Sequence, residues 1–178
     1  GAIIGTNAIV NKDIEPYTIH AGSPITKIKD RFSFEPLQEI SAFVEEQLPY
    51  FYRGFEHFSR AKSTAELIKD NQGIASEDEA LAVLKDTDWK KIEIHGFSRI
   101  NGALKIYVNG MLHQTTEIRT SESFQIQFNR EAVATNTYIT AYTLLPQLLK
   151  KHLCLQFKID AAGESKKYNF SISKIKVL

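Results

Sequence analysis

The second half of the chain alternates between apolar and polar residues, and this pattern restricts the possible folds more than any other feature. From Trp89 onward, apolar side chains recur two positions apart, which places them on one face of an extended strand. Asn109-Gly110 is a strong two-residue hairpin signal, and Asn101-Gly102 is a second candidate turn. The alternating runs are Ile92, Ile94 and Phe97; Leu104, Ile106 and Val108; Phe124, Ile126 and Phe128; Tyr138, Thr140 and Tyr142; Leu153, Leu155, Phe157 and Ile159; and Tyr168, Phe170, Ile172, Ile175 and Val177. About seven or eight short strands over residues 89–178 predict an antiparallel β-sandwich, either immunoglobulin-like or jelly-roll-like.

Residues 33–88 carry the pattern of a helical connector. Pro36 suits the first turn of a helix, and apolar residues at helical spacing follow it: Leu37, Ile40, Phe43, Val44 and Leu48. Pro49 ends or kinks this helix. The spacing predicts a second helix over residues 51–62 and a third over 63–70, and Ser76 and Glu79 resemble a capping box that starts a fourth through Lys85. Together with the strands, these helices predict a mainly β fold with helices, of the α+β class.

The charges of the chain are balanced. Lys and Arg number 22 against 21 for Asp and Glu, which gives a formal net charge of +1. A nucleic-acid or anionic-membrane partner would require a basic stripe, so we expect neither. No apolar run approaches the ~20 residues of a membrane span, and the first ten residues lack the charged start and long apolar stretch of a signal peptide. These patterns favour a cytoplasmic protein.

Cys154 and Met111 each stand alone in the chain. A single cysteine excludes an internal disulfide, and its apolar neighbours Leu153 and Leu155 indicate a buried small side chain and not a nucleophile. Because Met111 is the only methionine, the chain does not begin at an initiator, and we expect it to be a fragment of a longer protein.

The first 32 residues differ in composition from the rest of the chain and are rich in Ile, Gly, Thr, Asn and Pro. Ile4-Gly5-Thr6-Asn7-Ala8-Ile9 fits one hexapeptide unit of aliphatic, small and variable positions, and Val10 begins the next. The sequence then runs VNKDIEPYTIHAGSPITKIKDRF over residues 10–32. This segment closely resembles the end of the left-handed β-helix in the xenobiotic and sugar O-acetyltransferase family, with both prolines, Ala21-Gly22 and the closing Arg31-Phe32 in agreement. Residues 1–32 are therefore interpreted as the last hexapeptide-repeat coil and exit segment.

The resemblance implies an enzyme that transfers an acetyl group from acetyl-CoA to a hydroxyl or amine, and that assembles as a trimer with active sites between subunits. It also implies a CoA groove near the last coils. Asn11 and Lys12 would lie beside the pantetheine and phosphates, the Ala21-Gly22 backbone would line the groove, and Lys27 and Lys29 would approach the nucleotide phosphates. Ammonium groups suit this ligand because CoA carries several phosphate charges. The alternative is that these lysines are solvated surface charges.

Two residues depart from the family pattern. His20 occupies a position that is usually small or aliphatic, and Ile25 replaces the usual Ala, which would narrow the groove locally. The catalytic His of the family belongs to an earlier coil, so we interpret His20 as a substituted wall residue, assign no catalytic residue, and expect the chain alone to be inactive. One repeat cannot bury its own hydrophobic face, so we also expect that residues 1–20 do not form a β-helix by themselves.

Other residue clusters favour structural roles. Tyr50, Tyr52 and Arg53 could form a platform for an acceptor, but an aromatic helix face that packs on the sandwich is the preferred interpretation. The scattered histidines lack paired spacing and cysteine partners, so no metal site is expected. Asp86, Asp88 and Glu93 could bind Ca²⁺, but a solvated strand entrance is preferred.

The sequence thus predicts the C-terminal fragment of an acetyl-CoA-dependent O-acetyltransferase that acts on a sugar or glycan. Residues 33–88 are the predicted helical connector and residues 89–178 the accessory β-sandwich. The alternative is a non-catalytic module that binds a glycan or a protein or promotes oligomerisation. Small sandwiches attached to carbohydrate-active enzymes often hold glycans, an analogy that rests on fold alone.

Overall fold

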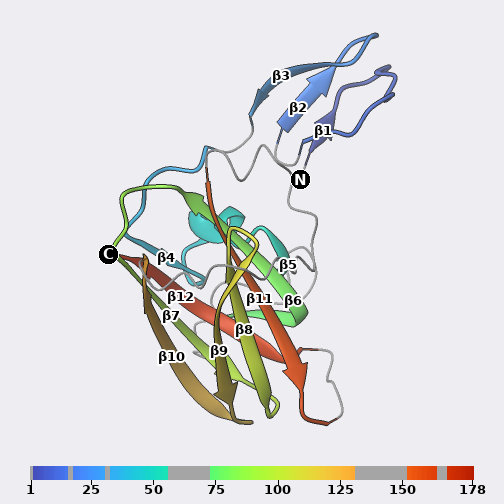
Figure 1. Cartoon of the computed structure of the whole chain (residues 1–178). Coiled ribbons are helices and arrows are strands. Elements are labelled where there is room, and N and C mark those ends of the chain that lie inside the picture. The colour runs from blue at the N-terminus through green and yellow to red at the C-terminus, as the bar shows by residue number, and fades with distance from the viewer. Residues whose placement is uncertain (1, 16–17, 31–32, 56–72, 131–151, 164–167) are drawn as a thin grey trace. The chain divides into compact units, whose positions relative to one another are not determined.

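The computed structural model describes residues 2–15, 18–30, 33–55, 73–130, 152–163 and 168–178 (Figure 1). The chain divides into two compact units, Gly1–Phe34 and Glu35–Leu178, which we call the N-terminal and C-terminal units. Each unit has its own sheet of strands. No helix in the described residues is both long and apolar enough to cross a membrane.

The N-terminal unit contains a small sheet of mixed direction in its described residues. Strand β1 (Ile3–Ile4) pairs in parallel with β2 (Thr18–Ala21), and β3 (Thr26–Asp30) pairs with β2 antiparallel. The described residues of this unit therefore form a three-stranded sheet and not the β-helix coil remnant of the predicted fold class, although a β-helix was not expected from residues 1–20 by themselves. The physical reason is that a single solenoid repeat has no adjacent repeat on which to stack, and an antiparallel return strand supplies pairing that the coil alone lacks.

The C-terminal unit is built on a continuous antiparallel sheet, whose hydrogen-bonded order among the described residues is β10-β7-β12-β6-β11-β8-β9. Two further strands pair at its side, β4 with β12 and β5 with β6. The strands are β4 (Glu39–Ser41), β5 (Arg53–Phe55), β6 (Ile74–Lys85), β7 (Lys91–Ser98), β8 (Gly102–Val108), β9 (Met111–Ile118), β10 (Glu122–Asn129), β11 (His152–Ala161) and β12 (Phe170–Val177).

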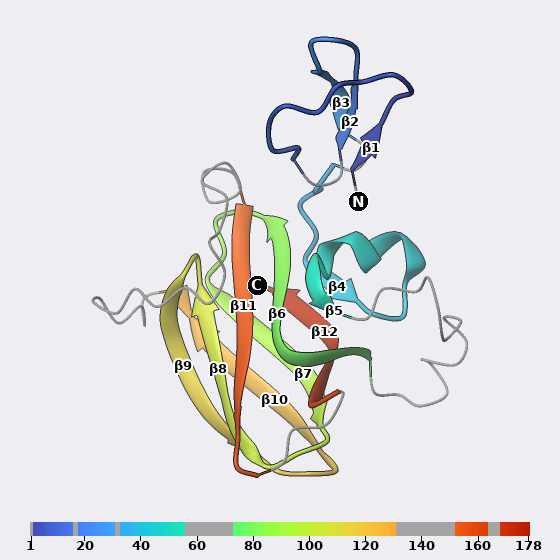
Figure 2. The ribbon, with the colours of Figure 1, turned by 90° about the vertical axis from the view of Figure 1, so that its right-hand side faces the viewer.

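The sheet folds into two layers where β12 meets β6. The start of β12 pairs with β6 at Phe170–Ile172, whereas its later residues pair with β4 instead. The layer of β10, β7, β12 and β4 therefore faces the layer of β5, β6, β11, β8 and β9 (Figures 1 and 2). A row of aromatic rings lies between the layers: Phe51 contacts Phe55 at 5.3 Å between centroids, Phe55 contacts Phe157 at 6.3 Å, and Phe157 contacts Phe170 at 6.4 Å.

The predicted α+β class with a helical connector is wrong, because the described part of residues 33–88 is mostly extended. Its helical content is one short 3₁₀ helix, Glu45–Tyr50, with Pro49 inside it. Where a helix over residues 37–48 was predicted, β4 forms instead, and the expected apolar stripe is only partly buried, with Val44 exposed. Where the capping box predicted a helix through Lys85, β6 forms, and the Ser76 hydroxyl donates to the Glu79 carbonyl oxygen (3.3 Å) and does not cap a helix.

The physical reason for the β6 error lies in its central position. Residues 80–84 of β6 are all buried, since β11 pairs along one edge, β5 and β12 pair along the other, and both faces of the strand are covered. A strand buried on both faces reads as a continuous apolar run, which periodicity cannot distinguish from a helix. The remaining predicted helical residues, 56–70, lie outside the described residues, as does the predicted strand over Tyr138–Tyr142.

Local turn chemistry was predicted correctly at one hairpin. Asn109 and Gly110 both adopt positive φ, +50° and +86°, and they connect β8 to β9 with Val108 opposite Met111. The Asn109 side-chain oxygen also accepts a hydrogen bond from the Cys154 N–H at 2.8 Å. Asn101-Gly102 is not a hairpin turn, because β8 pairs with β9 and β11 and not with β7.

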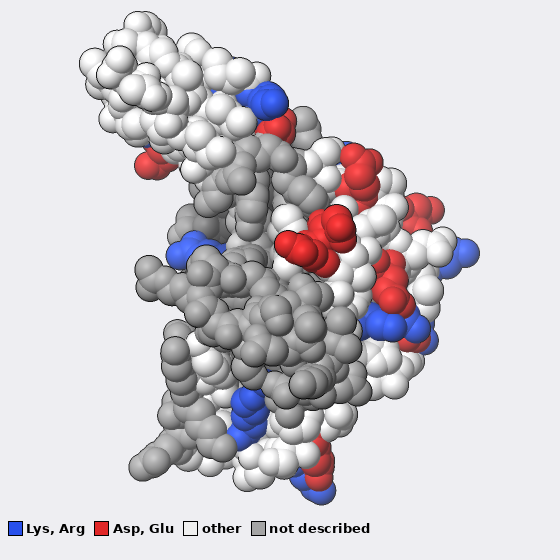
Figure 3. Space-filling view, turned by 180° about the vertical axis from the view of Figure 1, so that it is seen from behind, with Lys and Arg blue, Asp and Glu red and all other residues white. Residues whose placement is uncertain are grey.

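Charges of both signs are mixed over the described surface. Figure 3 shows Lys and Arg side chains interspersed with Asp and Glu on the face seen from behind. Opposite charges also pair across neighbouring strands of the C-terminal unit, such as Lys158 with Glu79 (3.2 Å) and Lys174 with Glu39 (3.2 Å). This distribution agrees with the balanced composition and forms no basic stripe on the described part of that face.

A glycine on β7 allows an aromatic ring to lie directly over the strand, and this generates a stability prediction. A Cβ at Gly96 would lie 2.3 Å from the Phe124 ring and 2.4 Å from the Ser171 carbonyl oxygen. We expect Gly96→Ala to lower the free energy of unfolding in urea by about 1–3 kcal/mol through overpacking. The matched control Ser123→Ala, at an exposed site on the neighbouring β10, should change it by less than about 0.5 kcal/mol. Equal stability of the two variants would contradict the packing described.

Candidate functional site

The residues that the resemblance assigns to CoA binding all lie in the N-terminal unit. Asn11 and Lys12 are exposed on the connection between β1 and β2. Ala21 ends β2 and Gly22 begins the turn that follows, while Lys27 and Lys29 are exposed on β3. Lys27 is opposite His20 and Lys29 is opposite Ile19 in the β2–β3 register, so the turn and the two lysines belong to one hairpin.

The turn between β2 and β3 depends on a glycine and a cis peptide. Gly22 has φ +92°, a conformation that favours glycine, and the Ser23–Pro24 bond is cis. The Thr26 hydroxyl donates to the Ala21 carbonyl oxygen at 3.3 Å across the hairpin, and Ile25 is 2% exposed. Ile25, the departure from the family pattern, therefore packs inward, and the exposed surface of the turn is formed by Gly22, Ser23 and Pro24.

A second glycine brings β1 close to this turn. The Gly5 N–H donates to the His20 carbonyl oxygen at 2.7 Å, and a Cβ at Gly5 would lie 2.8 Å from the Ala21 Cβ. Gly5, a small residue of the hexapeptide-like unit, thus permits close contact between its backbone and β2.

The three candidate lysines differ in how much of their charge is already balanced. The Lys27 ammonium pairs with Asp30 (2.8 Å) and Glu15 (2.9 Å), and hydrogen bonds to these carboxylates, Asp30 first, raise its pKa. Lys12 and Lys29 are exposed and have no ion pair within the described part of the chain. The charge available for an anionic ligand therefore comes from Lys12 and Lys29, and Lys27 is held by two acidic neighbours.

His20 is enclosed in the N-terminal unit. Its side chain is 5% exposed, and neither ring nitrogen has a hydrogen-bond partner in the described residues. A general base requires a group that orients the imidazole and access to the proton that it removes. The structure shows neither for His20, and this supports the interpretation of His20 as a wall residue.

The other candidates from the sequence lie in the C-terminal unit. Tyr50 is buried, and its hydroxyl accepts from the Glu35 N–H (2.9 Å) and donates to the Glu35 carbonyl oxygen (3.1 Å), so it does not form an open platform with Arg53. Burial raises the pKa of the Cys154 thiol to about 12, which agrees with the inert thiol expected.

The acidic residues near Trp89 are not brought together. Asp88 pairs with Arg130 (3.0 Å), whereas Glu93 pairs with Lys91 (2.7 Å), and that hydrogen bond lowers the pKa of Glu93. The described residues contain no group of three or more His, Cys, Asp or Glu side chains that could hold a metal ion.

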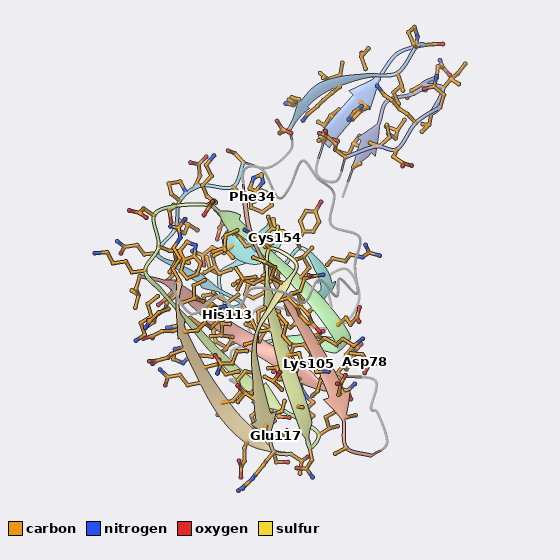
Figure 4. All side chains as sticks on the ribbon, viewed as in Figure 1. Phe34, Asp78, Lys105, His113, Glu117 and Cys154 are labelled. Carbon is orange, nitrogen blue, oxygen red and sulfur yellow. The ribbon has the colours of Figure 1, made fainter. Side chains whose placement is uncertain are left out.

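The strand β9 carries polar residues that the sequence analysis missed. His113 stacks on Phe128 of β10 with ring centroids 4.4 Å apart, and Phe128 contacts Trp89 at 6.4 Å. The Arg130 guanidinium lies 5.5 Å from the Trp89 ring centroid. Figure 4 shows His113 and Glu117 along β9. Residues 111–118 gave no alternating signal for this strand, because they place polar residues on both of its faces.

Short segments of known acetyltransferases are similar to this chain. It is 51% identical over 45 residues to a chloramphenicol acetyltransferase of Klebsiella aerogenes, which is 25% of this chain and 20% of that protein. It is 54% identical over 37 residues to a chloramphenicol acetyltransferase of Escherichia coli, and 50% identical over 38 residues to a probable macrolide acetyltransferase of Lysinibacillus sphaericus. The chain spans about a fifth of the length of these curated relatives. These matches support an acetyltransferase relationship, and no protein-family model matches the chain.

Likeness to solved structures is weaker. The CBM36-1 domain of a multidomain xylanase from the hindgut metagenome of Trinervitermes trinervoides aligns with a TM-score of 0.38 and 12% identity, over 60% of this chain and 77% of that chain. The CBM51-2 and INT domains of Clostridium perfringens ZmpB align with a TM-score of 0.36 and 10% identity, over 58% and 21%. Similarity at this level carries no conclusion about the fold or function of this chain.

The contact between His113 and Phe128 generates a prediction about pH. Burial lowers the pKa of His113 below its ordinary value of 6.5. Protonation therefore favours the unfolded chain, so the stability due to neutral His113 is complete above pH 6.5 and declines as the pH falls below it. We expect His113→Phe, which keeps an aromatic ring on Phe128, to reduce the loss of Tm between about pH 7.5 and about pH 5.

The control for this prediction is His95→Gln. The His95 imidazole lies 3.8 Å from Glu93, away from the aromatic contact. The acid sensitivity of Tm should fall in the His113 variant relative to this control. If His113→Phe lost as much Tm between these two pH values as the parent chain does, His113 would not be the group that titrates in this contact.

Proposed function

We propose that this chain is the C-terminal part of an acetyl-CoA-dependent O-acetyltransferase of the xenobiotic and sugar O-acetyltransferase family. The single observation that carries the proposal is the identity of 50% or more to chloramphenicol and macrolide acetyltransferases over short segments. The motif with Ala21-Gly22 and the closing Arg31-Phe32 supports the narrower family. The proposed acceptor is a sugar or glycan hydroxyl, and the proposed assembly of the whole protein is a trimer.

In this proposal, Lys12 and Lys29 bind phosphate groups of CoA. Both ammonium groups are exposed and without counter-ions in the described residues, so an anionic ligand would meet uncompensated positive charge. The Ala21-Gly22 backbone lines the groove and Asn11 supplies an exposed amide on the preceding connection. Lys27 contributes less directly, since Asp30 and Glu15 already neutralise it, and its role is to hold the hairpin.

The residues of the N-terminal unit fit such a ligand in two respects. Gly22, at positive φ, places no side chain on the turn, so CoA could approach the backbone of the turn closely. The lysines supply charge at the edge of the same hairpin. When bound, acetyl-CoA would supply the acetyl thioester, and the residues of this hairpin would bind and orient it.

The remaining C-terminal unit is proposed to be an accessory module with no transfer chemistry of its own. Its Cys154 is buried with a raised pKa, so the thiol is not a nucleophile near neutral pH. The alternative function, a non-catalytic module that binds a glycan, applies to this unit.

The proposed CoA site predicts the effect of removing two charges. We expect the double variant Lys12→Ala/Lys29→Ala of the purified chain to bind CoA about tenfold more weakly in isothermal titration calorimetry, because it loses two exposed ammonium–phosphate contacts. Binding by the parent chain should also weaken as salt is added, since exposed charges are screened.

The control is Lys158→Ala/Lys174→Ala, which removes two lysines of the C-terminal unit that pair with Glu79 and Glu39. This variant should keep the affinity of the parent chain for CoA. Equal loss in both double variants, or no CoA binding by the parent chain, would contradict the assignment. The chain itself should transfer no acetyl group from acetyl-CoA to chloramphenicol, and transfer would contradict the interpretation of His20 as a wall residue.

A further inference from the structure

The inner face of the edge strand β9 is polar where a core-facing strand is usually apolar. In the register with β8, Gln114 is opposite Ile106 and Thr116 is opposite Leu104. Ile106 and Leu104 are fully buried, and cross-strand partners share a face of the sheet, so Gln114 and Thr116 are on the side that faces the other layer. Polar residues at such positions call for an explanation, whereas exposed polar residues do not.

The strand that faces them is apolar. Residues 119–121 connect β9 directly to β10, and the two strands lie next to each other without a hydrogen-bonded ladder between them. The inward side of β10 carries Phe124, Ile126 and Phe128, since Gln125 and Gln127 alternate with them and are exposed. The stacking of His113 on Phe128 at 4.4 Å shows that the inner sides of the two strands meet. We call this region, formed by His113, Gln114, Thr116, Phe124 and Phe128, the β9–β10 seam.

The seam is partly open and retains hydrogen-bonding capacity. His113, Gln114, Thr116 and Phe124 are all half-buried, so a ligand can approach them from solvent. The Gln114 Nε2 donates to the Thr116 Oγ1 at 3.1 Å, which fixes both side chains and leaves the Gln114 Oε1 and the Thr116 hydroxyl hydrogen available. The His113 Nδ1 is buried, so His113 offers no group to a ligand there and instead covers the Phe128 ring.

We propose that the β9–β10 seam binds a neutral saccharide. A pyranose ring presents hydroxyl groups at its edge and an apolar face of C–H groups, and the seam offers a matching pair of surfaces. The amide of Gln114 and the hydroxyl of Thr116 take the hydroxyl groups, and the half-buried ring of Phe124 packs on the apolar face. This inference rests on the proposed role of the C-terminal unit as an accessory module and does not depend on CoA binding by the N-terminal unit.

The charges near the seam favour a neutral ligand over an anionic one. Arg130, the cation beside Trp89, pairs with Asp88 at 3.0 Å and donates from its backbone N–H to the Lys90 carbonyl oxygen. Glu117 of β9 is opposite Ala103 and alternates with Thr116, so its exposed carboxylate lies on the outer face of the strand and not in the seam. A phosphate or carboxylate ligand would need an unpaired cation, and the five residues that define the seam include neither Lys nor Arg.

The test uses the single tryptophan of the chain. Trp89 contacts Phe128, so a ligand in the seam should change its fluorescence. The purified chain is titrated with neutral tetrasaccharides of glucose, xylose, mannose and N-acetylglucosamine, by fluorescence and by calorimetry. We expect at least one of these probes to bind. Gln114→Ala should weaken that binding about tenfold through the loss of its hydrogen bonds, and Phe124→Leu should weaken it similarly through the loss of the ring.

Two results would overturn the proposal. The matched control Gln127→Ala removes an exposed amide from the outer face of β10, and equal weakening in this variant would place the saccharide elsewhere. Absence of binding to all four probes up to about 10 mM would exclude the proposed ligand class. A Tm measurement on each variant confirms folding, and Gln114→Asn provides a milder change if Gln114→Ala is unstable. CoA titration of the same samples separates this result from the proposed function.

Discussion

The C-terminal unit depends on one strand, β6, whose pairing with both β11 and β12 connects its two layers. β6 pairs with β11 along most of its length, and it pairs with the start of β12 where the sheet turns from one layer into the other. Residues 80–84 are buried, so neither face of this strand reaches solvent there. The row of aromatic rings from Phe51 to Phe170 then fills the space that this shared strand creates. A break in β6 would separate the layers and expose that row, which is why the unit needs an apolar run and not an alternating one at this position.

Features set by neighbouring residues were predictable from the sequence. Asn109-Gly110 forms its hairpin because positive φ at both positions suits these residue types whatever the surroundings. β7 was predicted because the residues that its pairing buries alternate along the strand, and apolar Ile92 and Ile94 occupy two of these positions. Features set by distant partners were not predictable. The pairing of β6 with Leu153–Lys158 turns a segment with a capping-box pattern into a strand, and no property of residues 76–85 alone carries that information. β9 was missed for the opposite reason, since its polar residues occupy both faces.

The candidate site shows the same division between local pattern and tertiary context. The motif identified the residues of the β2–β3 hairpin and the close approach of Gly5 to Ala21, since glycine is needed where backbones touch. It did not distinguish Lys27 from Lys29. That distinction arises because Glu15 and Asp30 lie beside Lys27, which reduces three equivalent lysines to two with available charge. The β9–β10 seam could not be read from the sequence at all, because its polar and aromatic sides come from two strands that meet without pairing.

Cys154 lies on β11 with its backbone N–H donating to the Asn109 side chain, and its thiol is fully buried. Alkylating reagents react with the thiolate, and burial holds this group in the thiol form near neutral pH. Because it is the only cysteine of the chain, modification of the thiol by such a reagent reports the exposure of β11, through local opening or global unfolding. The chain thus carries its own probe of local unfolding, positioned on the strand that joins β6 to β8, and requires no introduced label to measure how often the core of the C-terminal unit opens.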